Sequence, residues 1–140
     1  MRNRLLLISI ISALLFFVTL VSASTPSAEG AKAYIVSPAD GAMVTSPVKI
    51  VFGLDGMAVA PAGTDTPNSG HHHLLIDADA PPMDKPIPKD DHHMHFGKGQ
   101  TEASIELKPG KHTLQLLLGD KAHIPHNPPV MSEKITIMVH

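Results

Sequence analysis

Apolar side chains recur at every second position in several short segments of this chain, and glycine or proline separates one segment from the next. Val48, Ile50, Phe52 and Leu54 share one side of such a segment, and residues 134–139 repeat the pattern. Successive side chains of an extended strand point to opposite faces, so this spacing predicts strands that bury one face. No segment has the 3.6-residue periodicity of a long helix. The pattern therefore predicts an all-β fold.

The number and spacing of these segments indicate the architecture. We expect strands over residues 34–36, 48–54, 71–77, 101–107, 111–119 and 134–139. Turn-rich connections, 13 prolines and an aromatic content of 4% favour an antiparallel immunoglobulin-like β-sandwich of about seven short strands with long loops. A small barrel is the alternative.

One histidine is expected to have a structural role. Residues 107–114 resemble the turn and penultimate strand of many bacterial immunoglobulin-like modules, in which a tyrosine often stands at the position of His112. The polar end of such a side chain bonds to the backbone of the preceding corner. His112 also shares a strand face with Leu114 and Leu116, so we leave it out of the candidate site.

The first residues of the chain indicate export. Arg2 and Arg4 precede an apolar run that ends in Val21-Ser22-Ala23, which is the pattern of a secretory signal peptide with a small-residue cleavage site. We expect a signal peptide over residues 1–23, a flexible leader over 24–32 and the β-sandwich domain over 33–140. An uncleaved anchor is the alternative, although the run is shorter than the roughly 20 residues of a spanning helix. The expected location is the periplasm or the outside of a bacterial cell, with no membrane attachment after cleavage.

Composition excludes several classes of function. The chain has no cysteine, so thiolate metal sites, disulfides and redox thiols are absent. Loss of Arg2 and Arg4 with the signal peptide leaves 9 basic against 13 acidic residues, a formal charge of −4. An acidic domain of this kind gives no indication of nucleic-acid binding.

Histidines are concentrated in three short clusters, and nine of the ten lie between residues 71 and 126. Residues two apart on a strand share a face, so the spacing predicts one chelating pair within residues 71–73 and another within 92–95. A third pair lies in the loop 123–126. Long loops over residues 56–69 and 78–91 border the clusters, as is common for ligand-binding positions. The candidate metal ligands are His71, His73, His93, His95, His123, His126 and Met94.

The available ligand types favour particular metals. Imidazole is abundant and thiolate is absent, so the Irving–Williams order places copper first and zinc second, and the thioether of Met94 could also hold Cu⁺. Nearby aspartates match no calcium loop and are better suited to orienting imidazoles. Because protonated imidazole has no lone pair, we expect metal binding to weaken as the pH falls through about 6.5.

Three stretches together resemble a known family. They are Gly70-His71-His72-His73-Leu74-Leu75-Ile76-Asp77, His95-Phe96-Gly97-Lys98-Gly99-Gln100-Thr101-Glu102 and Pro109-Gly110-Lys111-His112-Thr113-Leu114-Gln115-Leu116. This combination resembles the bacterial domain-of-unknown-function family 4399. The resemblance implies an exported single-domain bacterial protein and supplies no activity.

These observations lead to one main hypothesis of function and two alternatives. The main hypothesis is an exported metal-binding module that buffers or delivers copper, with the metal ion and a periplasmic metal-accepting protein as partners and no catalytic residue. The first alternative is a copper-dependent redox enzyme, because His93-Met94-His95 is similar to the His-x-His strand of copper/zinc superoxide dismutases. The second is a module in which the histidines form a polar rim for a non-metal ligand or a protein.

Overall fold

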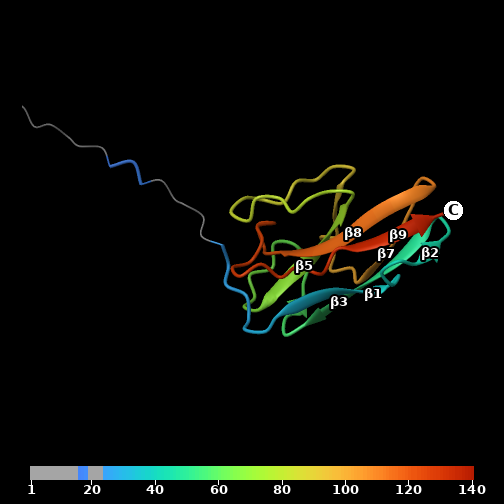
Figure 1. Ribbon diagram of the computed structural model, residues 1–140. Helices are drawn as coiled ribbons and strands as arrows, with labels where there is room; N and C mark the ends of the chain where they lie inside the picture. The colour runs from blue at the N-terminus through green and yellow to red at the C-terminus, as the bar shows by residue number, and fades with distance from the viewer. Residues whose placement is uncertain (1–15, 19–23) are drawn as a thin grey trace, which may run out of the picture.

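The chain folds into two β-sheets (Figure 1). The computed structural model describes residues 16–18 and 24–140, so the predicted signal peptide lies almost wholly outside the described residues. No helix occurs in the described ranges, which confirms the predicted all-β class. The strands are β1 (Lys32–Ser37), β2 (Met43–Val44), β3 (Val48–Asp55), β4 (Ala58–Val59), β5 (Ser69–Ile76), β6 (His93–His95), β7 (Glu102–Ile105), β8 (Gly110–Gly119) and β9 (Ile135–Val139).

All six predicted strands are present, with ends that differ by at most two residues. They correspond to β1, β3, β5, β7, β8 and β9. The alternation did not reveal β2, β4 and β6 as strands, since two or three residues are too few to show a period of two. The longer strands pair antiparallel, as expected, whereas the two-residue strands β2 and β4 pair in parallel with β9 and β5.

Each sheet contributes one face to a common apolar core. The smaller sheet has the strand order β1-β3-β7, and the larger has the order β2-β9-β8-β5-β4, with β6 also paired to β5. Ile50 and Phe52 of the smaller sheet meet Leu74, Leu114 and further apolar side chains of the larger one in this core. Burial of these side chains supplies the main stabilising free energy of the fold.

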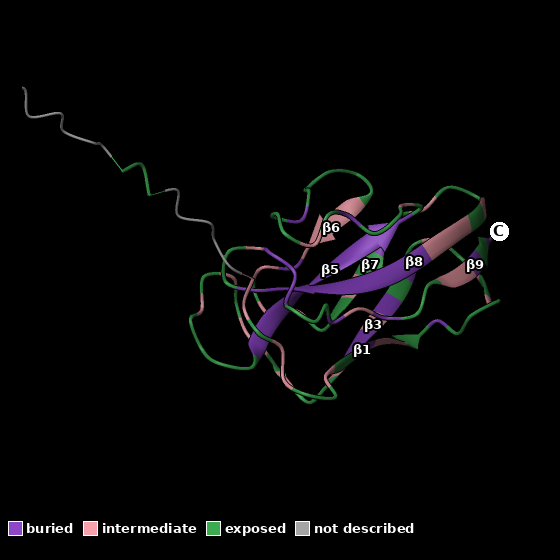
Figure 2. Cartoon of the chain, turned by 60° about the vertical axis from the view of Figure 1, so that its left-hand side comes forward, coloured by how far each residue is buried: buried purple, intermediate pink, exposed green. Residues whose placement is uncertain are grey.

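Strand β5 is buried along its whole length, as Figure 2 shows. It lies between β8 and the pair β4 and β6 in the larger sheet. Its second face does not point to water, because Leu75 packs with Ile87 and Leu117 in a smaller apolar cluster on that side. The loop between β5 and β6 therefore covers the outer face of the sheet, while the common core covers the inner face, so that β5 is buried on both sides.

The residues before β1 contact the end of the larger sheet. Asn127 donates its backbone N–H to Thr25 O at 3.0 Å, and Ser27 donates its own to Asn127 O at 3.2 Å. The Thr25 hydroxyl donates to Asp120 Oδ2 at 2.7 Å. This part of the predicted leader is thus tied to the loop that follows β8.

The described part of the chain contains no helix with the length and hydrophobicity needed to span a lipid bilayer.

Candidate metal centre

The three consecutive histidines of β5 divide between the two faces of the sheet. His72 points into the common core, where its ring centroid lies 5.2 Å from that of Phe52. His71 and His73 point to the outer face, with their ring centroids 4.7 Å apart. This division follows from the alternation of side chains along a strand. The strand therefore presents two imidazoles to one site.

Strand β6 adds a third imidazole. In the antiparallel pairing of β5 with β6, His95 stands directly opposite His73. Residues opposite each other in such a pair lie on the same face of the sheet, and the two ring centroids are 5.1 Å apart. The register of β6 thus fixes the position of His95.

A fourth imidazole comes from the loop after β8. His123 has a left-handed backbone conformation with φ of 65°, which is uncommon for a residue other than glycine. The Asp120 carboxylate holds this loop, because its Oδ1 accepts the N–H groups of Ala122 at 2.8 Å and Ile124 at 3.0 Å. Ile87 of the covering loop donates its N–H to His123 O at 2.8 Å. These bonds turn the His123 ring toward β5.

The four imidazoles form one compact group, which we call the four-histidine group. Each of His71, His73, His95 and His123 offers one nitrogen, and these four atoms lie within 4.8 Å of one another. His71 Nε2 and His123 Nδ1 share a hydrogen bond of 3.0 Å. His73 Nδ1 and His95 Nε2 are buried without a hydrogen-bond partner among the described residues. The group could hold a metal ion, since neutral imidazole is a common ligand.

Burial lowers the pKa of three of the four rings. The pKa of His71 is lowered to about 4. Loss of hydration is the largest cause, and repulsion from His123 and His95 follows. Burial, followed by the same kind of repulsion from His71 and His95, lowers the pKa of His73 to about 3. The pKa of His95 is also lowered, first by burial and then by His123 and Lys89. These three rings are neutral at pH 7, which is the form that donates a lone pair to a metal.

Two glycines make room for the rings. A Cβ at Gly119 would lie 2.6 Å from Cε1 and 3.0 Å from Nδ1 of His73, and a Cβ at Gly97 would collide with the His95 ring. Approaches this close are possible only where the neighbour has no side chain. Glycine at these two positions therefore leaves space for the rings of His73 and His95.

Three residues among the candidate ligands lie outside the four-histidine group. His93 places Nδ1 2.7 Å from Asp90 Oδ1. His126 places Nε2 3.1 Å from Ser69 O, in a buried position. Met94 stands opposite Leu74 and packs against the common core.

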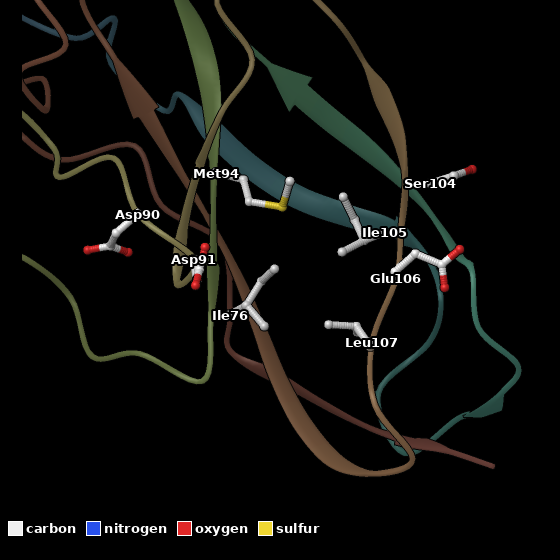
Figure 3. A pocket seen from close by; sticks show the side chains of 8 residues that line it. All are labelled: Ile76, Asp90, Asp91, Met94, Ser104, Ile105, Glu106 and Leu107. Carbon is white, nitrogen blue, oxygen red and sulfur yellow. The ribbon is translucent and has the colours of Figure 1, made fainter.

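The Met94 side chain reaches a separate cavity of about 410 Å³ (Figure 3). Its thioether points toward Ile105, while Asp90 and Asp91 lie on one side of the cavity and Glu106 on the other. Strand alternation explains this position, because Met94 projects to the opposite face from its neighbours His93 and His95.

His112 occupies the corner that the sequence predicts. Its Nε2 donates to Lys108 O at 2.8 Å, and its Nδ1 lies 2.7 Å from Asp77 Oδ2. Burial by itself lowers the pKa of this ring, but the bonds to Asp77 and Lys108 outweigh that effect, so the pKa is raised. The predicted bond from His112 to the backbone of the preceding corner is therefore present.

Four residues around the site were not predicted from the sequence: Asp120, Gly97, Gly119 and Lys89. Asp120 had a usable signal, because an aspartate directly after a strand often accepts the N–H two residues later in an Asx turn. The glycines gave only a general turn signal. Lys89 gave none, since a charged residue in a long loop is usually solvated.

The fold and the site together define an all-β domain with a candidate metal centre of four histidines. The chain belongs to the family described as domain of unknown function (DUF4399), whose model matches residues 50–140. This match confirms the resemblance seen in the sequence, and the matched range contains the whole four-histidine group. No curated protein and no solved structure matches the chain.

Proposed function

We propose that the four-histidine group binds a transition-metal ion and that the domain is a metal-binding module. The observation that carries this proposal is the convergence of four imidazoles whose nitrogens lie within 4.8 Å. Two of these rings keep a buried nitrogen without a hydrogen-bond partner in the described part of the chain. Such an atom costs roughly 1–3 kcal/mol, and coordination of a metal ion removes this cost.

The four nitrogens lie slightly farther apart than in a metal site, so the rings would move inward to bind one ion. Imidazole nitrogens bind zinc at about 2.0–2.1 Å, so two of them are about 3.3 Å apart in a tetrahedral site. Across a square plane the same bond length separates opposite nitrogens by about 4 Å. The 3.0 Å between His71 Nε2 and His123 Nδ1 already falls near the shorter value. A pair at the limit of 4.8 Å must move inward by about 0.8 Å for a square plane or about 1.5 Å for a tetrahedron, which side-chain torsions can supply.

Copper is the metal that we propose first, and zinc second. An all-imidazole site follows the Irving–Williams order, in which Cu²⁺ binds more tightly than Zn²⁺. Met94 packs against the common core on the other face of the sheet, so its thioether does not join the group to favour Cu⁺. This arrangement supports the divalent ion.

We extend the proposal to location, role and fold type. The predicted signal peptide supports export to the periplasm or beyond, where the module would buffer copper or deliver it to a metal-accepting protein. Exchange with a partner needs access, and His95 and His123 are only half-buried. An immunoglobulin-like β-sandwich is the fold type that we propose, supported by two sheets that share a core and by the corner at His112.

Metal content and metal titration test the function. Untagged protein is purified, its bound metal is measured, and the chelated protein is titrated with Cu²⁺ and with Zn²⁺ by calorimetry. We expect one ion per chain and displacement of Zn²⁺ by Cu²⁺. The double variant His73→Ala, His95→Ala should lose this binding.

The matched control removes two other histidines from the same region. The double variant His92→Ala, His93→Ala should bind Cu²⁺ like the parent, because neither ring belongs to the four-histidine group. If the parent binds neither metal more tightly than the His73→Ala, His95→Ala variant, the metal proposal fails. The histidines are then better explained as a polar rim for a non-metal ligand.

A further inference from the structure

A cavity opens onto one side of the four-histidine group. Its volume is about 220 Å³, and it is lined by His73, His95, His123, Pro86, Ile87 and Lys89. Three of the four imidazoles therefore border the cavity, whereas His71 does not line it. The covering loop between β5 and β6 supplies the opposite wall. A ligand in this cavity would lie directly beside an ion held by the group.

A divalent ion in the four-histidine group would keep its full positive charge. The four-histidine group contains no carboxylate, so four neutral imidazoles leave the full charge of a divalent ion in a partly buried place. Asp120 is the nearby anion that acts on His71. Its oxygens already accept from the Thr25 hydroxyl and from the N–H groups of Ala122 and Ile124. A buried charge without full compensation is unfavourable.

Lys89 adds a second positive charge where the cavity meets solvent. Its side chain lines the cavity and is exposed. Pro86 and Ile87 make the remaining wall apolar, and an apolar wall strengthens electrostatic attraction inside the cavity.

The size of the cavity limits what it can take. A water molecule occupies about 30 Å³ in the liquid, so the cavity has room for an ion of a few atoms. Pockets for drug-sized ligands usually measure about 300–1,000 Å³. A large metabolite therefore cannot be enclosed in this cavity.

We propose that the cavity is a site for a small anion, such as a carboxylate or a small inorganic anion, that binds the metal ion directly and pairs with the Lys89 ammonium. This inference rests on the proposed metal function. It deepens that function, because it assigns an exchangeable ligand to the metal ion. The anion offsets the charge of the ion and leaves through the cavity when the metal is transferred.

Azide binding to the copper-loaded protein tests the proposal. One equivalent of Cu²⁺ is first added and its binding verified by calorimetry, and azide is then titrated at low salt while absorption is recorded. We expect a saturable azide-to-copper charge-transfer band, and no azide binding to the metal-free protein. Acetate should compete with azide for the same site.

A matched pair of charge reversals tests the role of Lys89. Lys89→Glu should weaken azide binding by roughly five- to tenfold at low salt, since an exposed pair contributes up to about fivefold and reversal adds repulsion. Lys85→Glu changes the net charge equally and lies on the same loop, but Lys85 does not line the cavity. We expect this control to bind azide within about twofold of the parent, because screening weakens distant charges.

The outcomes separate the two proposals. If Cu²⁺ binds and azide does not, or if both charge reversals weaken azide equally, the anion site is overturned and the metal function stands. If Cu²⁺ itself fails to bind, the metal function falls and the anion site falls with it.

Discussion

His71 Nε2 lies 3.0 Å from His123 Nδ1, although 52 positions separate these residues in the chain. Only one of the two nitrogens can carry the shared hydrogen, because a hydrogen bond needs one donor and one acceptor. A metal ion that binds both nitrogens requires a lone pair on each. Metal binding at this pair would therefore require the hydrogen to move to the other nitrogen of its ring, and two coordination bonds would replace the hydrogen bond.

The two histidines of the loop 123–126 should respond differently to substitution. His123→Ala removes a member of the four-histidine group and should weaken Cu²⁺ binding by more than the 10- to 100-fold that loss of a supporting hydrogen bond costs. His126→Gln keeps a donor near Ser69 O and should leave Cu²⁺ affinity within about threefold of the parent. Calorimetric titration of both variants checks this, and equal losses would contradict the assignment.

Metal binding should persist to lower pH than free imidazole would allow. A proton competes with the metal at a histidine only near or below its pKa, and the pKa values are about 4 for His71 and about 3 for His73. We therefore expect these two rings to bind with little proton competition between pH 7 and about 5.5, contrary to the simple expectation of weakening at about 6.5. Cu²⁺ titrations at both pH values measure the effect. A steep loss proportional to the protonation of ordinary imidazoles would contradict it.

The metal-free protein should lose stability as the pH falls below about 6.5, and His72 should contribute to this loss. Burial lowers the pKa of His72 from 6.5 to about 4 in the folded state. Between these values the unfolded chain binds the extra proton, so the free energy of unfolding falls by about 1.4 kcal/mol per pH unit for this group.

Replacement of His72 by leucine tests this contribution. The side chain is fully buried beside Phe52 and makes no hydrogen bond among the described residues, so leucine can take its place in the core. Relative to the parent, His72→Leu should gain about 2 kcal/mol between pH 6.5 and 5. Denaturant unfolding of both metal-free proteins at several pH values measures the gain. Parallel pH profiles would show that His72 does not titrate as described.

His112→Phe should lower stability and leave metal binding intact. The ring would keep its packing but lose the bonds to Lys108 O and Asp77, which costs about 1–3 kcal/mol. The raised pKa of His112 means that its charged form stabilises the fold below the unfolded value of about 6.5, and this part is lost as the pH rises through the folded pKa. The difference in unfolding free energy between parent and variant should therefore shrink at alkaline pH. An unchanged Cu²⁺ affinity is the control, and a weakened one would contradict the separation of this corner from the site.

Gly119→Ala should weaken metal binding without changing a ligand. The added methyl group would lie 2.6 Å from Cε1 of His73, so the ring must shift out of its place in the group. Displacement of a ligand by a neighbouring side chain should cost Cu²⁺ affinity by about 10-fold or more. Gly63→Ala is a useful comparison, because nothing lies within 4 Å of a Cβ there and metal affinity should not change, although its φ of 82° costs some stability. Similar affinities of the Gly119 variant and the parent would show that the pocket around His73 is adaptable.

Strand positions were accessible from the sequence because alternation is a local property. Val48, Ile50 and Phe52 mark β3 by spacing alone, whatever they pack against. No alternating pattern in the sequence indicates the pairing of β4 with Ser69 and Gly70. It depends on contacts that form only when distant parts of the chain meet.

The sequence by itself determined the chemistry of the candidate site. It set imidazole without thiolate as the ligand type, and it placed His71 and His73 on one face, since covalent geometry alternates side chains along any strand. Tertiary structure decided which other histidines join them. The register of β6 placed His95 opposite His73, while the bonds of Asp120 and the positive φ of His123 turned that ring inward and left His126 at Ser69. Strand register and loop conformation arise from pairings between distant residues, and the spacing of histidines in a loop does not encode them.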